Sequence, residues 1–494
     1  MADKRQQIGA LKSSVIIGSA SLITIAIAIV KVKVLAVLLG PGGIGLIGFL
    51  QNLVSGVSTV AGLGISSVGT RQIAQAASSE EASELAIARR ALFLSTMFVC
   101  LLGFTSFLVV SHLFFVNVDR LENNSTNKLI LAVAVIATIA AASQISLLTG
   151  MRRIVHIAKL NVISSLLSAF VGILAIWFLG FSGIAVLVLA MPLSSLLVGA
   201  VFLQKLPKSA EVSNSNKEIA FQFKTIARLG LAFMLGGAIS TLAPLAVRTL
   251  LIDSLGETAL GEFQAAWQIS MLYLGFVLSV MGTDYYPRLT ASISNKSQAV
   301  EMVNEQTEIA VLLSLPVLVL MLGTAPWIIP MLYTDQFKNT ASLLSLLILG
   351  DSLKVVSWPL GYVLLATGDG RKFLFAECCG FGSFVIVSWF LIPHFGLQAA
   401  GLGFIAMYGV YLPFVYRLAR KEIGFKWRTH NFVQIIVLLV FCLCVKAASA
   451  YSAYVGLAAS GVFAFVGICW ANFRLRKLKP SGGFIGKLIF KLDK

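Results

Sequence analysis

The sequence predicts an all-α integral membrane protein of about 14 transmembrane helices, built from two parallel six-helix bundles and two extra C-terminal spans. Three observations lead to this prediction: an apolar composition, apolar runs of spanning length, and an internal repeat. Of the 494 residues, 58% are hydrophobic and only 12% are charged, whereas soluble domains carry about 25% charged residues. A chain this long and this apolar has to hide its surface in lipid.

The apolar runs are about 20 residues long, which is the length of one membrane-spanning helix. A helix satisfies its own backbone groups in lipid, whereas a transmembrane barrel would show alternating segments of about ten residues. The even number of predicted spans places both termini on one side. The spans are residues 11–39, 42–66, 91–117, 128–150, 158–179, 182–204, 226–252, 258–284, 307–334, 341–366, 371–393, 396–419, 431–449 and 451–472.

The basic residues predict the orientation of the chain. Starting with the N-terminus, every second connection is basic, and these segments hold 30 of the 38 Lys and Arg residues. Because cytoplasmic loops carry the excess of Lys and Arg, both termini are predicted to be cytoplasmic. The formal charge of +17 is therefore mostly a topology signal, and no nucleic-acid partner is expected.

The second half of the chain resembles the first. The segments Leu147–Arg153 and Leu365–Lys372 share one pattern: apolar residues, then Thr-Gly, then one or two further residues, and then two basic residues. Lys33 and Arg248 each lie 22 residues into the first predicted span of their half. Six spans per half give both copies the same orientation. Transporters with such parallel repeats bind substrate between the halves, near the midplane.

The predicted organisation has five parts. The C-terminal tail alternates basic and apolar residues, a pattern typical of a helix lying on an anionic leaflet, although a solvated tail explains it equally well. The parts are an N-terminal six-helix lobe (1–204), a cytoplasmic linker (205–225), a C-terminal six-helix lobe (226–425), an additional two-span hairpin (426–473) and a basic cytoplasmic amphipathic tail (474–494).

Six of the ionisable residues inside the predicted spans are candidates for function, because a charge there is costly and usually functional. If Lys33, Arg248 and Lys354 face one cavity, they predict an anionic substrate, and one cation at the same repeat position in each half suits a diphosphate. The two carboxylates are predicted to serve in coupling or gating, by exchanging a proton or a cation. The predicted substrate-binding residues are Lys33, Arg248, Lys354 and Lys31, and the predicted coupling or gating residues are Asp351 and Glu377.

Each of these residues except Arg248 also has a simpler interpretation. Lys31 and Lys33 would be able to extend their ammonium groups to the membrane surface. Asp351 and Lys354 share one helix face, at positions i and i+3, and would satisfy one another as a structural pair. Glu377 lies close to a predicted cytoplasmic loop.

The sequence predicts no enzyme, no cofactor and no metal site. It contains neither a phosphate-binding P-loop motif nor a His-Glu-x-x-His motif. The six cysteines lie in apolar stretches, and the four histidines are scattered near span ends, without metal-ligand spacing. The longest predicted outward loop has about ten residues, which is too short for the catalytic domain that a membrane-embedded glycan polymerase or ligase would need.

Six segments stand out by their order and spacing, which are more specific than any one of them. They are Leu35–Leu46, Thr70–Gln75, Gly261 with Trp267-Gln268, Gly350–Val355, Gly361-Tyr362 and Ala376-Glu377. Together they resemble the Wzx-type O-antigen flippases, which are polysaccharide repeat-unit flippases of the multidrug/oligosaccharidyl-lipid/polysaccharide exporter superfamily. The resemblance covers about residues 10–425.

The resemblance implies two six-helix bundles forming a V around a cationic cavity, in the inner membrane of a bacterium. It implies that an undecaprenyl-diphosphate-linked oligosaccharide is moved from the cytoplasmic to the periplasmic leaflet by alternating access. Membrane lipids, a glycan polymerase and other polysaccharide assembly proteins are the implied partners. The extra spans at 431–472 depart from twelve-span members. The alternatives are a cation-coupled multidrug or metabolite exporter and a lipid II flippase of the same superfamily.

Overall fold

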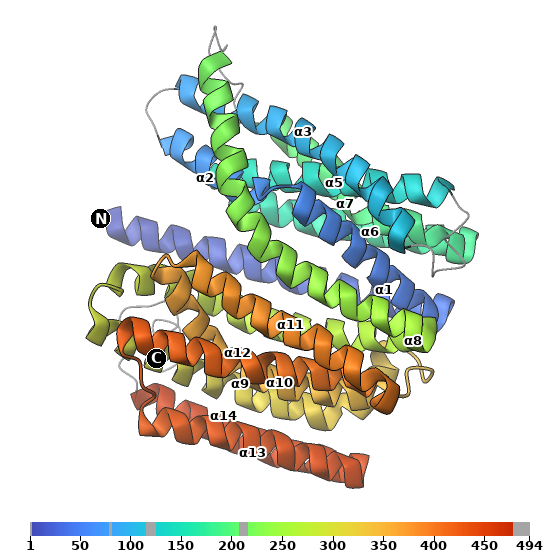
Figure 1. Ribbon diagram of the computed structural model, residues 1–494, viewed down its shortest axis with the longest axis vertical. Helices are drawn as coiled ribbons and strands as arrows, with labels where there is room; N and C mark the ends of the chain where they lie inside the picture. Colours follow the sequence, from blue (N-terminus) through green and yellow to red (C-terminus); the bar gives the residue numbers. More distant parts are fainter. Residues whose placement is uncertain (1, 79–81, 115–124, 207–215, 478–494) are drawn as a thin grey trace. The chain divides into compact units, whose positions relative to one another are not determined.

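The computed structural model describes the backbone of residues 2–78, 82–114, 125–206 and 216–477, and side-chain surroundings for 18–77, 83–112, 125–206, 234–272 and 285–475. All regular structure in the described backbone is helical (Figure 1). The elements are α1 (Ala2–Ala61), α2 (Ile65–Ser78), α3 (Ala82–Phe114), α5 (Ser125–Gly150), α6 (Ile154–Leu179), the 3-10 helix η1 (Gly180–Gly183), α7 (Ile184–Gln204), α8 (Asn216–Ser292), α9 (Lys296–Leu332), α10 (Thr340–Ala366), α11 (Gly370–Phe395), α12 (Gln398–Ile423), α13 (Thr429–Tyr451) and α14 (Ala453–Lys477).

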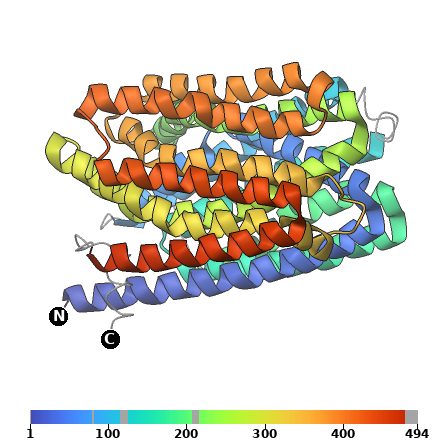
Figure 2. The ribbon, with the colours of Figure 1, turned by 90° about the horizontal axis from the view of Figure 1, so that it is seen from below.

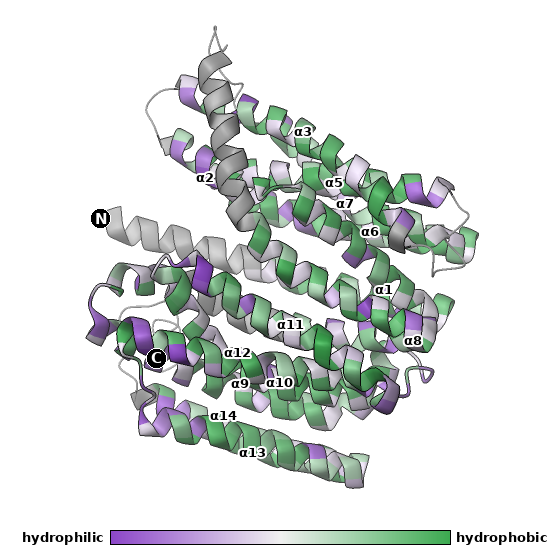
Figure 3. Ribbon diagram, viewed as in Figure 1, coloured by the Kyte–Doolittle hydropathy of each residue, from purple (hydrophilic) through white to green (hydrophobic). Residues whose placement is uncertain are grey.

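These helices confirm the predicted all-α membrane protein. Within the described residues, 11 segments are long and apolar enough to cross a membrane. Figure 3 shows apolar residues along the bodies of the helices and hydrophilic residues near many of their ends. Three segments, Gly18–Ala61, Ile154–Gln204 and Met234–Leu272, have 44, 51 and 39 residues. They are longer than the roughly 20 residues that one crossing needs, and each contains a break in the helix.

The breaks in α1 and α8 lie where the sequence predicts turns between spans. Each helix continues through a glycine whose backbone is not helical: Gly40 has φ 64° and ψ −169°, and Gly256 has φ 82° and ψ −179°. This backbone region is open almost only to glycine. Gly40 and Gly256 therefore bend two long helices at positions that also correspond in the predicted repeat.

Gly256→Ala is expected to lower the stability of the purified protein by about 1–3 kcal/mol, because alanine is strained in this backbone region. A Cβ at Gly256 would have no atom within 4 Å, so the strain alone is tested. The matched control is Gly236→Ala in the same helix, where a Cβ also meets nothing within 4 Å and alanine favours the helix. A thermal unfolding midpoint that falls equally in both variants would contradict the strained position at Gly256.

A second pair of glycines matches across the two halves. Gly180 ends α6 with φ 57° and ψ −134°, and Gly396 ends α11 with φ 54° and ψ −131°. Each donates its backbone N–H to the carbonyl four residues earlier, on Ile176 and Ile392. The same backbone conformation at equivalent positions supports the internal repeat.

The chain divides into two compact units, Met1–Thr249 and Leu250–Lys494. In the N-terminal unit, α6 packs on α7 and α1, while α5 packs on α7, α3 and α2. Small residues allow these close approaches, as is usual between helices in a membrane: Gly150 lies against Ile73, and Gly172 lies against Leu187. Residues 207–215 of the predicted linker lie outside the described residues, and residues 216–225 belong to the beginning of α8. The predicted lobe boundaries stay predictions.

The C-terminal unit holds the second arm of α8 and the helices α9 to α14. Figures 1 and 2 show α9 to α14 running side by side. In this unit α12 packs on α10 and α11, and α9 packs on α10, α13 and α14. The hairpin of α13 and α14 is therefore docked on α9. Most of the predicted tail lies beyond residue 477, outside the described residues.

Candidate functional site

The C-terminal unit contains a charged cluster at the centre of α10. Asp351 is 1% exposed and accepts a hydrogen bond of 2.5 Å from the Ser270 hydroxyl of α8 on its Oδ2 atom. Its Oδ1 atom is buried and has no hydrogen-bond partner among the described residues. The carboxylate thus keeps one unused acceptor inside the protein.

Lys354 lies one helical turn from Asp351 and is half-buried. Its Nζ atom is 3.6 Å from the Met271 sulfur and 5.9 Å from the centre of the Tyr408 ring. Asp351 and Glu377 are both close enough to interact electrostatically with its ammonium group. One cation therefore lies beside an aromatic face and within electrostatic range of two carboxylates, which stabilises a charge that lipid alone would not.

Glu377 enters the cluster from α11. Its carboxylate lies close enough to the Tyr411 hydroxyl of α12 to interact with it electrostatically. Two glycines make room for Tyr411, since a Cβ at Gly361 would lie 2.9 Å from its hydroxyl oxygen and a Cβ at Gly380 would lie 3.3 Å from its own Cβ. Four helices, α8, α10, α11 and α12, thus build this site. We call it the Lys354 cluster: Ser270, Met271, Asp351, Lys354, Glu377, Tyr408 and Tyr411.

The other three predicted residues lie in the N-terminal unit. Arg248 is 1% exposed, and its Nη1 atom donates a 3.0 Å hydrogen bond to the Pro244 carbonyl. Lys31 and Lys33 on α1 are half-buried. The structure thus brings Asp351, Lys354 and Glu377 together, while a cavity shared with Lys33, Arg248 and Lys31 stays a prediction.

Another segment quoted for the resemblance has a packing role in the C-terminal unit. Trp267 stacks on Phe384 with ring centres 5.9 Å apart and meets Phe404 edge-on at 5.4 Å. A Cβ at Gly350 would lie 2.5 Å from Phe404, so glycine is needed for this approach. The aromatic group thus packs α8, α11 and α12 together and meets α10 at Gly350, the residue before Asp351.

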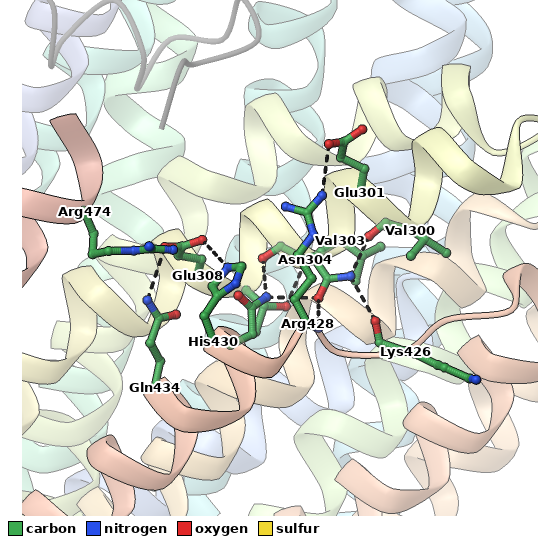
Figure 4. Close-up of polar contacts among 12 residues, drawn as sticks. Val300, Glu301, Val303, Asn304, Glu308, Lys426, Arg428, His430, Gln434 and Arg474 are labelled. Carbon is green, nitrogen blue, oxygen red and sulfur yellow. Dashed lines mark hydrogen bonds and ion pairs between the residues drawn. The ribbon is translucent and has the colours of Figure 1, made fainter. Parts of the chain in front are cut away.

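A second polar network, which the sequence did not predict, joins α9 to the terminal hairpin (Figure 4). At its centre is Glu308, which is 1% exposed. Its Oε1 atom accepts hydrogen bonds from Arg474 Nε at 2.8 Å and Gln434 Nε2 at 3.2 Å, and Arg474 Nη2 lies 2.6 Å away. His430 Nε2 is 2.9 Å from Oε2. One buried carboxylate therefore binds α13 and α14 together.

Asn304, one turn before Glu308, fixes the connection between α12 and α13. Its Nδ2 atom donates to the Lys426 carbonyl at 3.1 Å, and its Oδ1 atom accepts from the Arg428 backbone N–H at 2.9 Å. The Asn431 side chain donates to the Asn304 carbonyl at 2.8 Å. One sequence pattern could have indicated this network. Glu301, Asn304 and Glu308 recur every three or four residues and so form a polar stripe on an otherwise apolar helix.

The sequence comparisons identify the family. The family model described as polysaccharide biosynthesis protein matches residues 10–292, more than half of the chain. The chain belongs to this polysaccharide biosynthesis protein family. The match confirms the predicted resemblance to polysaccharide repeat-unit flippases of the exporter superfamily. The chain is also 24% identical over 414 residues to proteins named lipid III flippase from Escherichia coli (strain K12) and Shigella flexneri, covering 81% of this chain and 95% of each relative.

Solved structures show the same fold. The lipid II flippase MurJ in an inward closed conformation has a TM-score of 0.69 at 12% identity, over 94% of this chain and 100% of that one. An inward-facing multidrug resistance MATE family transporter of the MOP superfamily has a TM-score of 0.69 at 16% identity, over 81% of this chain and 94% of that one. These relatives and structures are named flippases and transporters, in agreement with the prediction that this chain is not an enzyme.

Proposed function

We propose that the chain is a flippase that moves an undecaprenyl-diphosphate-linked oligosaccharide from the cytoplasmic to the periplasmic leaflet of a bacterial inner membrane. The observation that carries the proposal is Lys354, an ammonium group held by four helices within the membrane spans. A charge in this position is costly and is kept where it binds a cargo. An O-antigen or related polysaccharide repeat unit carries the diphosphate that such a cation would bind. The relatives named lipid III flippase support a lipid-linked glycan as the cargo.

In this proposal the chain crosses the membrane about 14 times, because each of the three long broken segments supplies two crossings. Both termini are cytoplasmic, and the two six-helix lobes alternate access around a cavity between them. Lys33, Arg248 and Lys31 reach the diphosphate from the N-terminal lobe, and Lys354 reaches it from the C-terminal lobe. The lipid tails stay in the bilayer during the movement. A glycan polymerase and other assembly proteins receive the cargo on the far side.

The Lys354 cluster also offers a route for coupling. With all three groups ionised, it contains one cation and two carboxylates, Asp351 and Glu377. When the Lys354 ammonium group binds a phosphate of the cargo, both carboxylates lose their counter-ion in a medium of low dielectric constant. Uptake of a proton or a cation then restores the balance, and its passage across the membrane draws on about 2.3 kcal/mol per charge per 100 mV.

Reconstituted flipping tests the proposal. The purified chain in liposomes is expected to carry a fluorescent undecaprenyl-diphosphate oligosaccharide across the bilayer, measured as the fraction protected from an external quencher. Lys33→Ala and Arg248→Ala are each expected to lower the rate about tenfold at equal protein content, which corresponds to about 1.4 kcal/mol. Flipping no faster than in protein-free liposomes would overturn the function. Normal rates in both variants, with an active wild type, would overturn only the assigned cations.

The second candidate is a cation-coupled multidrug or metabolite exporter, which is favoured by the structural likeness to MATE transporters. The intramembrane lysines and arginine disfavour a cationic drug, because like charges repel. The same liposomes separate the candidates when they are loaded with a cationic dye or supplied with fluorescent lipid II. Dye efflux without glycan-lipid flipping would favour the exporter, and preference for lipid II over the oligosaccharide would favour a lipid II flippase.

A further inference from the structure

The end of α12 and the connection to α13 form a basic surface that the proposed transport site does not use. In the stretch 417–430 there is one carboxylate, that of Glu422, against five Lys and Arg residues. All five side chains are exposed. We call this surface the α12–α13 platform. Its cations are Arg417, Arg420, Lys421, Lys426 and Arg428.

Most of these charges are not neutralised by the residues that the structure describes. Glu422 is bound by Lys372 of α11 at 2.6 Å, and Arg428 is paired with Glu301 of α9 at 3.0 Å. Among the described residues, no ion pair or side-chain hydrogen bond is formed by the remaining cations. These are Arg417, Arg420, Lys421 and Lys426. The platform therefore presents four unneutralised positive charges.

The platform is also held in one conformation. Gly424 ends α12 in the left-handed region with φ 74°, and its N–H donates to the Arg420 carbonyl at 3.0 Å. Asn304 binds the backbone of Lys426 and of Arg428, as described above, so the connection is tied to the buried face of α9 (Figure 4). A basic connection kept only for topology would need no such support, since the positive-inside effect depends on charge alone.

Aromatic side chains lie beside the basic ones. The Trp427 ring stacks on Tyr416 with centres 4.6 Å apart, and buried Phe425 meets both rings edge-on. Trp and Tyr at the end of a span are typical of the lipid headgroup layer. Arg417, Arg420 and Lys421 are spaced i, i+3 and i+4, so they share one face of α12 at this depth.

We propose that the α12–α13 platform binds the phosphodiester headgroup of an anionic phospholipid. Arg binds phosphate oxygens through a planar pair of N–H groups, and Lys adds point charges around them. The lipid's acyl chains run along the apolar outer surface of the same helices. This site recognises a resident membrane lipid and is independent of the cargo.

Competitive lipid binding to the full-length protein tests the proposal. The purified chain is exposed to mixtures of phosphatidylglycerol and phosphatidylcholine, and native mass spectrometry measures which lipid stays bound. The wild type is expected to prefer phosphatidylglycerol. The triple variant R420Q/K421Q/K426Q is expected to lose about tenfold of that preference, about twofold for each cation removed, since each cation near an anionic headgroup adds to its attraction.

The matched control is R71Q/R90Q/K296Q, which removes the same charge from exposed positions on other basic connections. It is expected to keep the wild-type preference. If the triple variant does not fold, K426Q alone is compared with K296Q alone, and only K426Q is expected to lower the preference, by about twofold. A wild type without preference, or equal preferences in platform and control variants, would overturn the site.

Discussion

Lys354→Ala is expected to slow flipping of the undecaprenyl-diphosphate oligosaccharide by about 10- to 100-fold, because a hydrogen bond to a charged group contributes about 1.5–3 kcal/mol. Lys354 is the one cation in the cluster, so no other ammonium group in it is able to take its place. Lys354→Arg keeps the charge and is expected to recover part of the rate. The measurement is the initial flipping rate in liposomes with equal amounts of protein.

Two further variants separate transport from folding. Lys446→Ala removes another half-buried lysine of the same unit, on α13, and is expected to leave the rate unchanged. The double variant D351N/K354M removes the cation together with one carboxylate, so fewer buried charges are left unpaired. It is expected to be more stable than Lys354→Ala and equally slow. Recovery of flipping in the double variant would show that Lys354 serves only to neutralise Asp351.

The sequence was informative about spans because a membrane helix must satisfy its backbone within one segment. Apolar runs of about 20 residues are therefore visible without knowledge of any partner. The helix ends were less predictable. α9 begins at Lys296, well before the predicted span at 307, because the helix continues past its apolar part through residues 298–306, which mix polar and apolar side chains.

The charged cluster was partly predictable for a related reason. Asp351 and Lys354 are rare residue types in an apolar run, and their i, i+3 spacing places them on one face. Ser270, Tyr408 and Tyr411 were not predicted, since neutral polar residues are common in spans. Their place in the cluster depends on how α8, α11 and α12 pack on α10, which no local pattern specifies.

The Glu308 network was missed because its partners are far apart in the chain. His430 and Arg474 lie 122 and 166 residues after Glu308. In the sequence, His430 and Arg474 each lie at the end of a different predicted span, where a polar residue is expected to face water. Only the fold brings Glu308 of α9, the beginning of α13 and the end of α14 together.

Glu308→Ala is expected to loosen the terminal hairpin and to destabilise the protein by about 3 kcal/mol. The substitution leaves Arg474, His430 and Gln434 without their shared acceptor, and breaking a buried ion pair costs much more than breaking an exposed one. Cys442 reports the change locally, because it is on α13 and fully buried. A membrane-permeant thiol reagent is expected to label Cys442 slowly in the wild type and rapidly in Glu308→Ala. Cys444 and Cys469 are exposed on the same hairpin and serve as internal standards.

The matched control is Glu301→Gln, which breaks a neighbouring ion pair on α9 whose side chains are 58% and 41% exposed. Exposed pairs contribute about 0–1 kcal/mol, so Cys442 is expected to stay protected. Packing alone offers the competing explanation of the docked hairpin, because Gly323 and Gly467 bring α9 and α14 into close contact at Ser460 and Leu315. If Cys442 stays unreactive in Glu308→Ala, this packing holds the hairpin and the carboxylate does not. If it reacts, the hairpin depends on a charge network at one end of α9, and its docking is electrostatic as well as apolar.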